Sequence, residues 1–157
     1  MKFLARMILS FFGTGFVRTA PGTVGSLVAA LAIYILQPSI FELSISIRAV
    51  VVGIAIVTMF LLGWFLTTQV LTRDFDQSWI VLDEVVGMLL ASVPVLFFSE
   101  NFLRDLIFAF ALFRFFDISK LGSRQIDARG TPFSVFADDT AAGIFAAVTL
   151  LLIQVLI

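Results

Sequence analysis

The sequence contains no cysteine and no histidine. Without cysteine there are no disulfides, thiol nucleophiles or thiolate metal sites, and without histidine there are no Ser-His-Asp triads, phosphohistidine intermediates or imidazole-bound zinc. Charge is also scarce, because Lys, Arg, Asp and Glu make up only 13% of the 157 residues. Any catalysis must therefore use carboxylates, Lys, Arg, hydroxyls, backbone groups and a hard metal ion.

Apolar side chains dominate the composition. They make up 61% of the chain, including 19 phenylalanines, and the mean hydropathy is +1.12. Soluble domains are roughly 45–50% apolar and about 25% charged, so this chain has more apolar side chain than one small core could bury. The sequence predicts an integral membrane protein with a single domain over residues 1–157. The near balance of 10 basic and 11 acidic residues argues against a nucleic-acid partner.

Uncharged runs indicate where the chain crosses the bilayer. Those after Arg18, after Arg48 and at the C-terminus are long enough for spans of about 20 residues. Two shorter apolar segments reach that length only by including acids at their ends. We therefore predict an all-α, polytopic bundle of about five transmembrane or re-entrant helices after an N-terminal interfacial helix. The predicted helices cover about 22–37, 49–70, 83–98, 102–117 and 138–157.

Two prolines mark expected interruptions. Pro38 should close the first helix, and Pro94 should kink or break the third. Lys and Arg fall mainly in alternate loops, leaving Arg48 and Arg104 on the opposite face. This bias predicts a cytoplasmic N-terminus. The glycine-rich start of the first helix and the helix ends with paired acids then share the cytoplasmic face.

The segment 20–26 reads Ala-Pro-Gly-Thr-Val-Gly-Ser at the start of the first predicted helix. Unpaired N–H groups and the positive end of the helix dipole favour an anion there, so Gly22, Thr23 and Ser26 are candidates for phosphate binding. The alternative is structural: Pro21 begins the helix and the small residues allow close helix packing.

Two acidic pairs, Asp83-Glu84 and Asp138-Asp139, are each predicted to open a helix at the cytoplasmic face. One such pair is commonly a helix cap that satisfies the helix dipole. Two pairs that converge on one face, in a chain with only 11 acids, instead suggest a site for a hard cation such as Mg²⁺.

Arg114 and Asp117 are spaced i, i+3, and Lys120 continues the same face if the helix persists. This stripe is either an ion pair at membrane depth, or a phosphate-binding Arg beside a metal-binding Asp. The sequence Asp74-Phe75-Asp76 follows a membrane helix rather than a buried strand. We therefore interpret it as a solvated loop rather than as the nucleophile motif of aspartyl-phosphate phosphatases.

Several different short motifs follow one another along nearly the whole chain. Together they resemble the bacterial phosphatidylglycerophosphatase A family, with segment 120–137 departing from that family's usual pattern. The matching pieces are Gly13-Thr14-Gly15, residues 20–27, residues 83–88, Phe113-Arg114 with Asp117 and Lys120, Asp127, Asp138-Asp139, and Ala142-Gly143.

The resemblance implies a Mg²⁺-dependent phosphatase of the bacterial inner membrane that converts phosphatidylglycerophosphate to phosphatidylglycerol. On this hypothesis Mg²⁺ is held by carboxylates, some of them also catalytic, while basic and small residues bind the phosphate. The metal set is Asp83, Glu84, Asp117, Asp138 and Asp139, of which Asp83, Asp138 and Asp139 are also catalytic. The substrate-binding set is Arg114, Lys120, Gly22, Thr23 and Ser26.

The alternative is a small membrane transporter or scaffold whose buried acids form a path for cations. Transport sites tend to lie near the bilayer midplane, whereas these acids are predicted at helix ends on one face. Their position therefore favours the enzyme.

Overall fold

The computed structural model describes residues 2–72, 75 and 77–156, and over these residues the chain is helical without strands. The predicted solvated loop at Asp74 and Asp76 lies outside the described residues. A short 3-10 helix, η1 (Thr14–Phe16), follows the first α-helix. The α-helices are α1 (Lys2–Leu9), α2 (Pro21–Glu42), α3 (Ile45–Val70), α4 (Leu82–Ala91), α5 (Val93–Phe98), α6 (Phe102–Ser119), α7 (Arg124–Asp127) and α8 (Pro132–Leu156).

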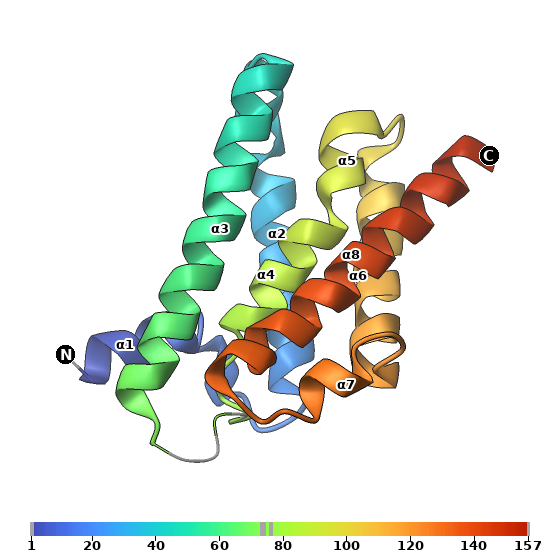
Figure 1. Ribbon diagram of the computed structural model, residues 1–157. Helices are drawn as coiled ribbons and strands as arrows, with labels where there is room; N and C mark the ends of the chain where they lie inside the picture. The colour runs from blue at the N-terminus through green and yellow to red at the C-terminus, as the bar shows by residue number, and fades with distance from the viewer. Residues whose placement is uncertain (1, 73–74, 76, 157) are drawn as a thin grey trace.

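The long helices form a bundle, and α1 lies across one end of it (Figure 1). The start of α2 and the short α7 lie at this same end. The α2–α3 connection, the α5–α6 connection and the end of α8 lie at the opposite end. Helices α2, α3 and α8 are each long and apolar enough to cross a membrane. Large apolar side chains such as Ile35 and Ile54 are exposed on their outer faces, as expected of a surface that contacts lipid.

Helices α4 and α8 pack against each other through glycine. A Cβ atom added at Gly143 would lie 2.4 Å from the carbonyl oxygen of Gly87, and one added at Gly87 would lie 2.8 Å from the carbonyl oxygen of Asp139. Only small residues allow backbones to approach this closely. Fully buried Met88, Phe113 and Phe136 complete the core around this crossing.

The predicted third helix is interrupted, as its proline suggested. Helix α4 ends at Ala91, and α5 begins at Val93 with Pro94 in its first turn. Proline is tolerated in a first turn because the N–H groups there have no partner within the helix. The break divides the segment into two short helices.

The prediction that Pro38 closes the first helix is wrong, because α2 continues to Glu42. Arg48 stabilises this extra turn by donating hydrogen bonds to the carbonyl oxygens of Phe41 (3.1 Å) and Leu43 (3.3 Å). Arg48 lies inside α3, which begins at Ile45 rather than near residue 49. Satisfied carbonyl groups at the helix end offset the hydrogen bond that proline cannot form.

The last helix also begins earlier than predicted, at Pro132 rather than near residue 138. The backbone N–H of Ser134 donates to Thr131 Oγ1 (3.1 Å), and the N–H of Thr131 donates to Ser134 Oγ (2.8 Å). This reciprocal pair is a capping box followed by proline in the first turn. Asp138 and Asp139 therefore lie in the second turn of α8, and the prediction that they open the helix is wrong.

Candidate active site

The buried acids gather at the end of the bundle where α4 begins, α6 ends and α8 makes its second turn. A small polar cavity of about 80 Å³ opens among them. Each of the four aspartates in it is no more than 7% exposed. The lining residues are Asp83, Glu84, Asp117, Lys120, Gly130, Val135, Asp138 and Asp139.

Three carboxyl groups of this cluster lie close together. Asp83 and Glu84 come from the first turn of α4 and Asp139 comes from α8, and one oxygen of each lies within 4.8 Å of the others. The Oε2 atom of Glu84 is buried and has no hydrogen-bond partner among the described residues. Both residues of the first acidic pair therefore contribute to one site, although neighbours on a helix point about 100° apart.

Two basic side chains border the acids. The Nη1 atom of Arg114 lies 2.6 Å from Asp117 Oδ2, which confirms that the i, i+3 pair shares a face of α6. Lys120 directly follows α6 as its C-cap residue. Its Nζ reaches across to α8 and lies 2.5 Å from Asp138 Oδ2 and 3.9 Å from Asp139 Oδ1.

Lys120 is held in its charged form. Partial burial lowers the pKa of Lys120, but the hydrogen bond to Asp138 and the charges of Asp139, Asp138 and Asp117 outweigh burial and raise it above its ordinary value. The ammonium group therefore stays protonated and offsets part of the negative charge of the cluster.

The first turn of α2 packs directly on this cluster. A Cβ atom added at Gly22 would lie 2.0 Å from Glu84 Oε1, so a larger residue there would require the carboxyl group of Glu84 to move. Ser26, one turn further on, accepts a hydrogen bond of 3.4 Å from Arg114 Nη1 and donates one of 2.7 Å to the carbonyl oxygen of Gly22. Thr23 is partly exposed and makes no hydrogen bond to the cluster among the described residues.

Among the described residues, the cluster holds more carboxyl groups than basic side chains. Five acids face Arg114 and Lys120, and the pairs of 2.6 Å and 2.5 Å involve Asp117 and Asp138. Buried charges are normally paired or bound to a metal. Asp83, Glu84 and Asp139 offer clustered carboxylate oxygens, the ligands of hard divalent cations. Together with the unpartnered oxygen of Glu84, this donor set fits a metal ion.

The structure thus brings together most of the residues singled out from the sequence. Two lining residues, Gly130 and Val135, were missed. Val135 precedes Asp139 by one helical turn, so recognising the Thr131 capping box would have placed it on the same face. Gly130 has a positive φ of 58° in the loop before α8, a conformation that glycine adopts readily. The presence of a glycine in the sequence does not by itself show that the residue lies in the site.

Fold and site together define an integral membrane protein with a carboxylate-rich site, competent to bind metal, at one end of its helix bundle. Residues 7–154 match the family described as Phosphatidylglycerophosphatase A, and the chain belongs to that family of phosphatases.

Two curated relatives match most of the chain. A Haemophilus influenzae protein named Phosphatidylglycerophosphatase A is 36% identical over 150 residues, covering 91% of this chain and 84% of the relative. A Bacteroides thetaiotaomicron protein, named as a candidate phosphatidylinositol-3-phosphatase, is 35% identical over 153 residues, covering 92% of this chain and 90% of the relative. No solved structure gives a significant match.

Proposed function

We propose that this protein hydrolyses the phosphomonoester of phosphatidylglycerophosphate to give phosphatidylglycerol and inorganic phosphate. The observation that carries the proposal is the buried group of three carboxyls, Asp83, Glu84 and Asp139, beside a guanidinium group at the end of a membrane bundle. Family membership and the Haemophilus influenzae relative support this substrate. We further propose that the site and the N-terminus face the cytoplasm at the bacterial inner membrane, following the distribution of Lys and Arg.

The proposed cofactor is Mg²⁺, held by Asp83, Glu84 and Asp139 with Asp117 and Asp138 beside them. When bound, the metal would neutralise phosphate oxygens and favour attack on phosphorus. Among the protein groups, Arg114 offers a buried Nε donor that has no partner within the described part of the chain. Such a donor suits a phosphate oxygen, and Arg binds phosphate through more than one N–H.

The remaining roles follow from position. Lys120, held charged among the acids, would stabilise negative charge that develops on the transferred phosphoryl group. Gly22, Thr23 and Ser26 would contribute N–H and hydroxyl groups from the start of α2. Asp83, Asp138 and Asp139 are the proposed catalytic acids. In the net reaction, the water oxygen bonds to phosphorus, and the ester oxygen leaves and takes up a proton.

A second substrate is a phosphorylated inositol lipid, as the name of the Bacteroides thetaiotaomicron relative indicates for that protein. Both lipids present a phosphomonoester at the membrane surface, so the same acids and the same Arg114 would serve. The transporter or scaffold alternative is disfavoured by family membership.

The experiment measures phosphate release by the detergent-purified protein. Phosphatidylglycerophosphate and phosphatidylinositol 3-phosphate are each supplied with Mg²⁺ or with a chelator. We expect Mg²⁺-dependent release from phosphatidylglycerophosphate, and loss of that release in Asp139→Asn. The matched control is Asp105→Asn, which alters an equally buried aspartate at the opposite end of the bundle and should retain turnover.

Three outcomes would contradict parts of the proposal. Preferential release from the inositol lipid would mean that this lipid, rather than phosphatidylglycerophosphate, is the substrate. Full activity in the presence of chelator would show that the reaction does not need a metal ion. Wild-type turnover in Asp139→Asn would remove that carboxyl from the reaction.

A further inference from the structure

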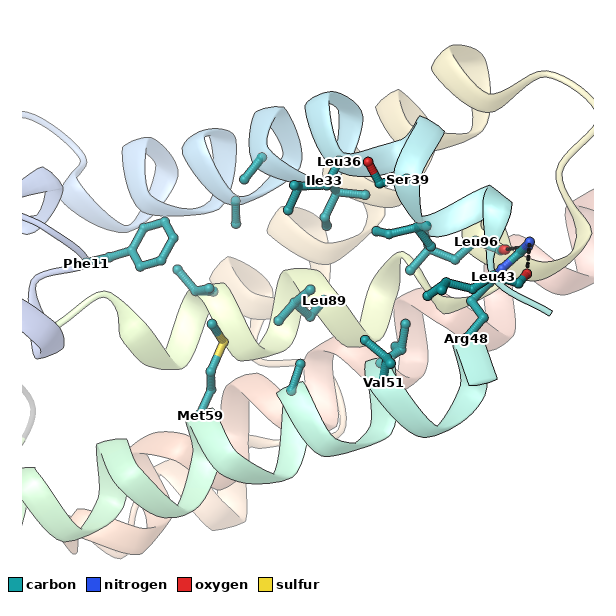
Figure 2. Close-up of a pocket in the computed structure, with 16 residues that line it drawn as sticks. Phe11, Ile33, Leu36, Ser39, Leu43, Arg48, Val51, Met59, Leu89 and Leu96 are labelled. Carbon is teal, nitrogen blue, oxygen red and sulfur yellow. Dashed lines mark hydrogen bonds between the residues drawn. The ribbon is translucent and has the colours of Figure 1, made fainter. Parts of the chain in front are cut away.

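Two apolar hollows lie along α2. The larger, of about 550 Å³, is bounded by α2, α3, α4 and α5, with Phe11 at one end and Arg48 at the other (Figure 2). The smaller, of about 370 Å³, is a groove between α2 and α6. Both hollows have volumes typical of small-molecule sites, roughly 300–1,000 Å³. They differ in how they relate to the acidic cluster.

The α2–α6 groove is bounded by the two helices that carry the Ser26–Arg114 contact. Ala30 of α2 lines the groove one turn beyond Ser26, and Phe110 of α6 lines it one turn before Arg114. Residues four apart lie on the same face of a helix. The groove therefore begins next to the guanidinium group and continues toward the opposite end of the bundle, where Tyr34 lines it.

The larger hollow is not bounded by α6, the helix that carries Arg114. Arg114 therefore does not stand at its end. Its own charged residue is Arg48, whose guanidinium group already donates to the carbonyl oxygens of Leu96 (2.9 Å), Phe41 and Leu43. Arg48 is thus occupied by backbone at the end of the bundle away from the acids.

Arg114 supplies independent evidence that a ligand belongs at the start of the α2–α6 groove. Its Nη1 atom is bound to Asp117 and Ser26, but its Nε is buried with no partner among the described residues. A buried donor without an acceptor costs free energy, and a bound anion would relieve that cost. A polar donor at the start of an apolar groove matches a phospholipid, with its phosphates beside the donor and its hydrocarbon chain below.

We propose that the α2–α6 groove holds one acyl chain of the lipid substrate while its phosphate-bearing headgroup lies at Arg114 and the acidic cluster. This inference rests on the proposed function. The acyl chain leaves a lipid environment that is as apolar as the groove, so little hydrophobic free energy is gained. The contribution of the groove is orientation: it fixes where the phosphomonoester lies relative to the carboxyls.

The test compares groove variants on substrates with and without acyl chains. Leu31 of α2 is 53% exposed and lines the groove, so Leu31→Trp should fill it without disturbing the core. Ile107→Trp does the same from α6. The substrates are diacyl phosphatidylglycerophosphate in micelles and its water-soluble deacylated headgroup. The quantity measured is kcat/KM for the diacyl lipid divided by kcat/KM for the deacylated headgroup.

We expect this ratio to fall about tenfold in both groove variants, because a chain held out of the groove misplaces the reacting phosphate. Val57→Trp is the matched control, since Val57 is 56% exposed on α3 and lines neither hollow. Val51→Trp fills the larger hollow instead. Both α3 variants should keep the wild-type ratio.

Each contrary result has its own meaning. Equal ratios in Leu31→Trp, Ile107→Trp and Val57→Trp would show that only bulk lipid fills the groove, which overturns the inference. A fall confined to Val51→Trp would overturn it by moving the chain to the larger hollow. If the wild-type protein released phosphate from neither substrate, that result would overturn the proposed function, and this inference with it.

Discussion

Buried carboxyl groups lie at both ends of this bundle, and their surroundings differ. At the end away from the proposed active site, Asp105 is 2% exposed and accepts hydrogen bonds from Ser99 Oγ (2.7 Å), Gln154 Nε2 (2.9 Å) and Arg104 Nε (2.8 Å). One carboxyl thus has three donors. Among the described residues of the acidic cluster, five carboxyls lie beside two basic side chains, and one oxygen of Glu84 has no partner.

The contrast separates an acid held by structural hydrogen bonds from acids that could hold a metal ion. A buried carboxylate surrounded by donors is stable without further partners. An excess of buried carboxylates is not, because desolvation and mutual repulsion both oppose ionisation. Burial alone therefore does not distinguish the two ends, whereas the imbalance between acceptors and donors does, and it supports the proposed site.

The strongest test of this contrast removes one carboxylate from the cluster. Asp83→Asn should lower kcat/KM for the phospholipid by about 10³-fold, since a metal ligand contributes several kcal/mol to the transition state and each tenfold is about 1.4 kcal/mol. The fold should persist, because the substitution removes repulsion. Phosphate release and the melting temperature are measured together. Wild-type turnover in a folded variant would contradict the assignment.

Stabilisation by a metal ion should depend on the acidic cluster and not on Asp105. At a free Mg²⁺ concentration of about 100 times Kd, binding adds about 2.7 kcal/mol to the free energy of unfolding. We expect the melting temperature of the chelator-treated protein to rise with Mg²⁺ in the wild type and in Asp105→Asn, but not in Asp83→Asn. An equal rise in all three would place the metal elsewhere.

Arg114→Lys tests whether the guanidinium group acts only as a charge. Lysine keeps the charge but loses the planar set of donors, including the buried Nε. We expect kcat/KM to fall about 10-fold to 100-fold, with the folded state retained through the contact to Asp117. Unchanged kinetics would mean that Arg114 only neutralises Asp117.

The smallest catalytic effect is expected at the opposite end. Asp105→Asn replaces an ionic acceptor of three hydrogen bonds, so the free energy of unfolding should fall by about 1–3 kcal/mol, measured by thermal or denaturant unfolding in detergent. Activity should stay within about threefold of the wild type under conditions where the protein is folded, because Asp105 lies far from the acids. A loss as large as that of Asp83→Asn would dissolve the distinction between the two ends.

Much of this arrangement was predictable from local sequence. Long uncharged runs identified α2, α3 and α8, and proline predicted the break between α4 and α5. The Asp83-Glu84 pair lies in the first turn of its helix and Arg114 pairs with Asp117, both as predicted, because each relation depends only on one helix. These features follow from hydrophobicity and helical periodicity alone.

The errors have two sources, one distant in the sequence and one local. Helix α2 passes Pro38 because Arg48, on the next helix, binds the carbonyl groups at its end. Asp138 lies in a second turn because Thr131 and Ser134 begin α8 early, and that local signal was overlooked. Lys120, at the end of α6, contacts Asp138 of α8. The pattern of a single helix cannot predict such a contact between helices.

For the proposed metal site, the glycine crossing of α4 and α8 would bear on the size of the ion. Asp83 precedes Gly87 by one turn and Asp139 precedes Gly143 by one turn, so the close backbone contact lies directly beneath the carboxylates of both helices. Oxygens lie 2.0–2.1 Å from Mg²⁺ but 2.3–2.6 Å from Ca²⁺. A single methyl group at Gly143 would push the helices apart and widen the gap between their carboxylates. Discrimination between a small and a large cation would then depend on Gly87 and Gly143, neither of which contacts the ion through a side chain.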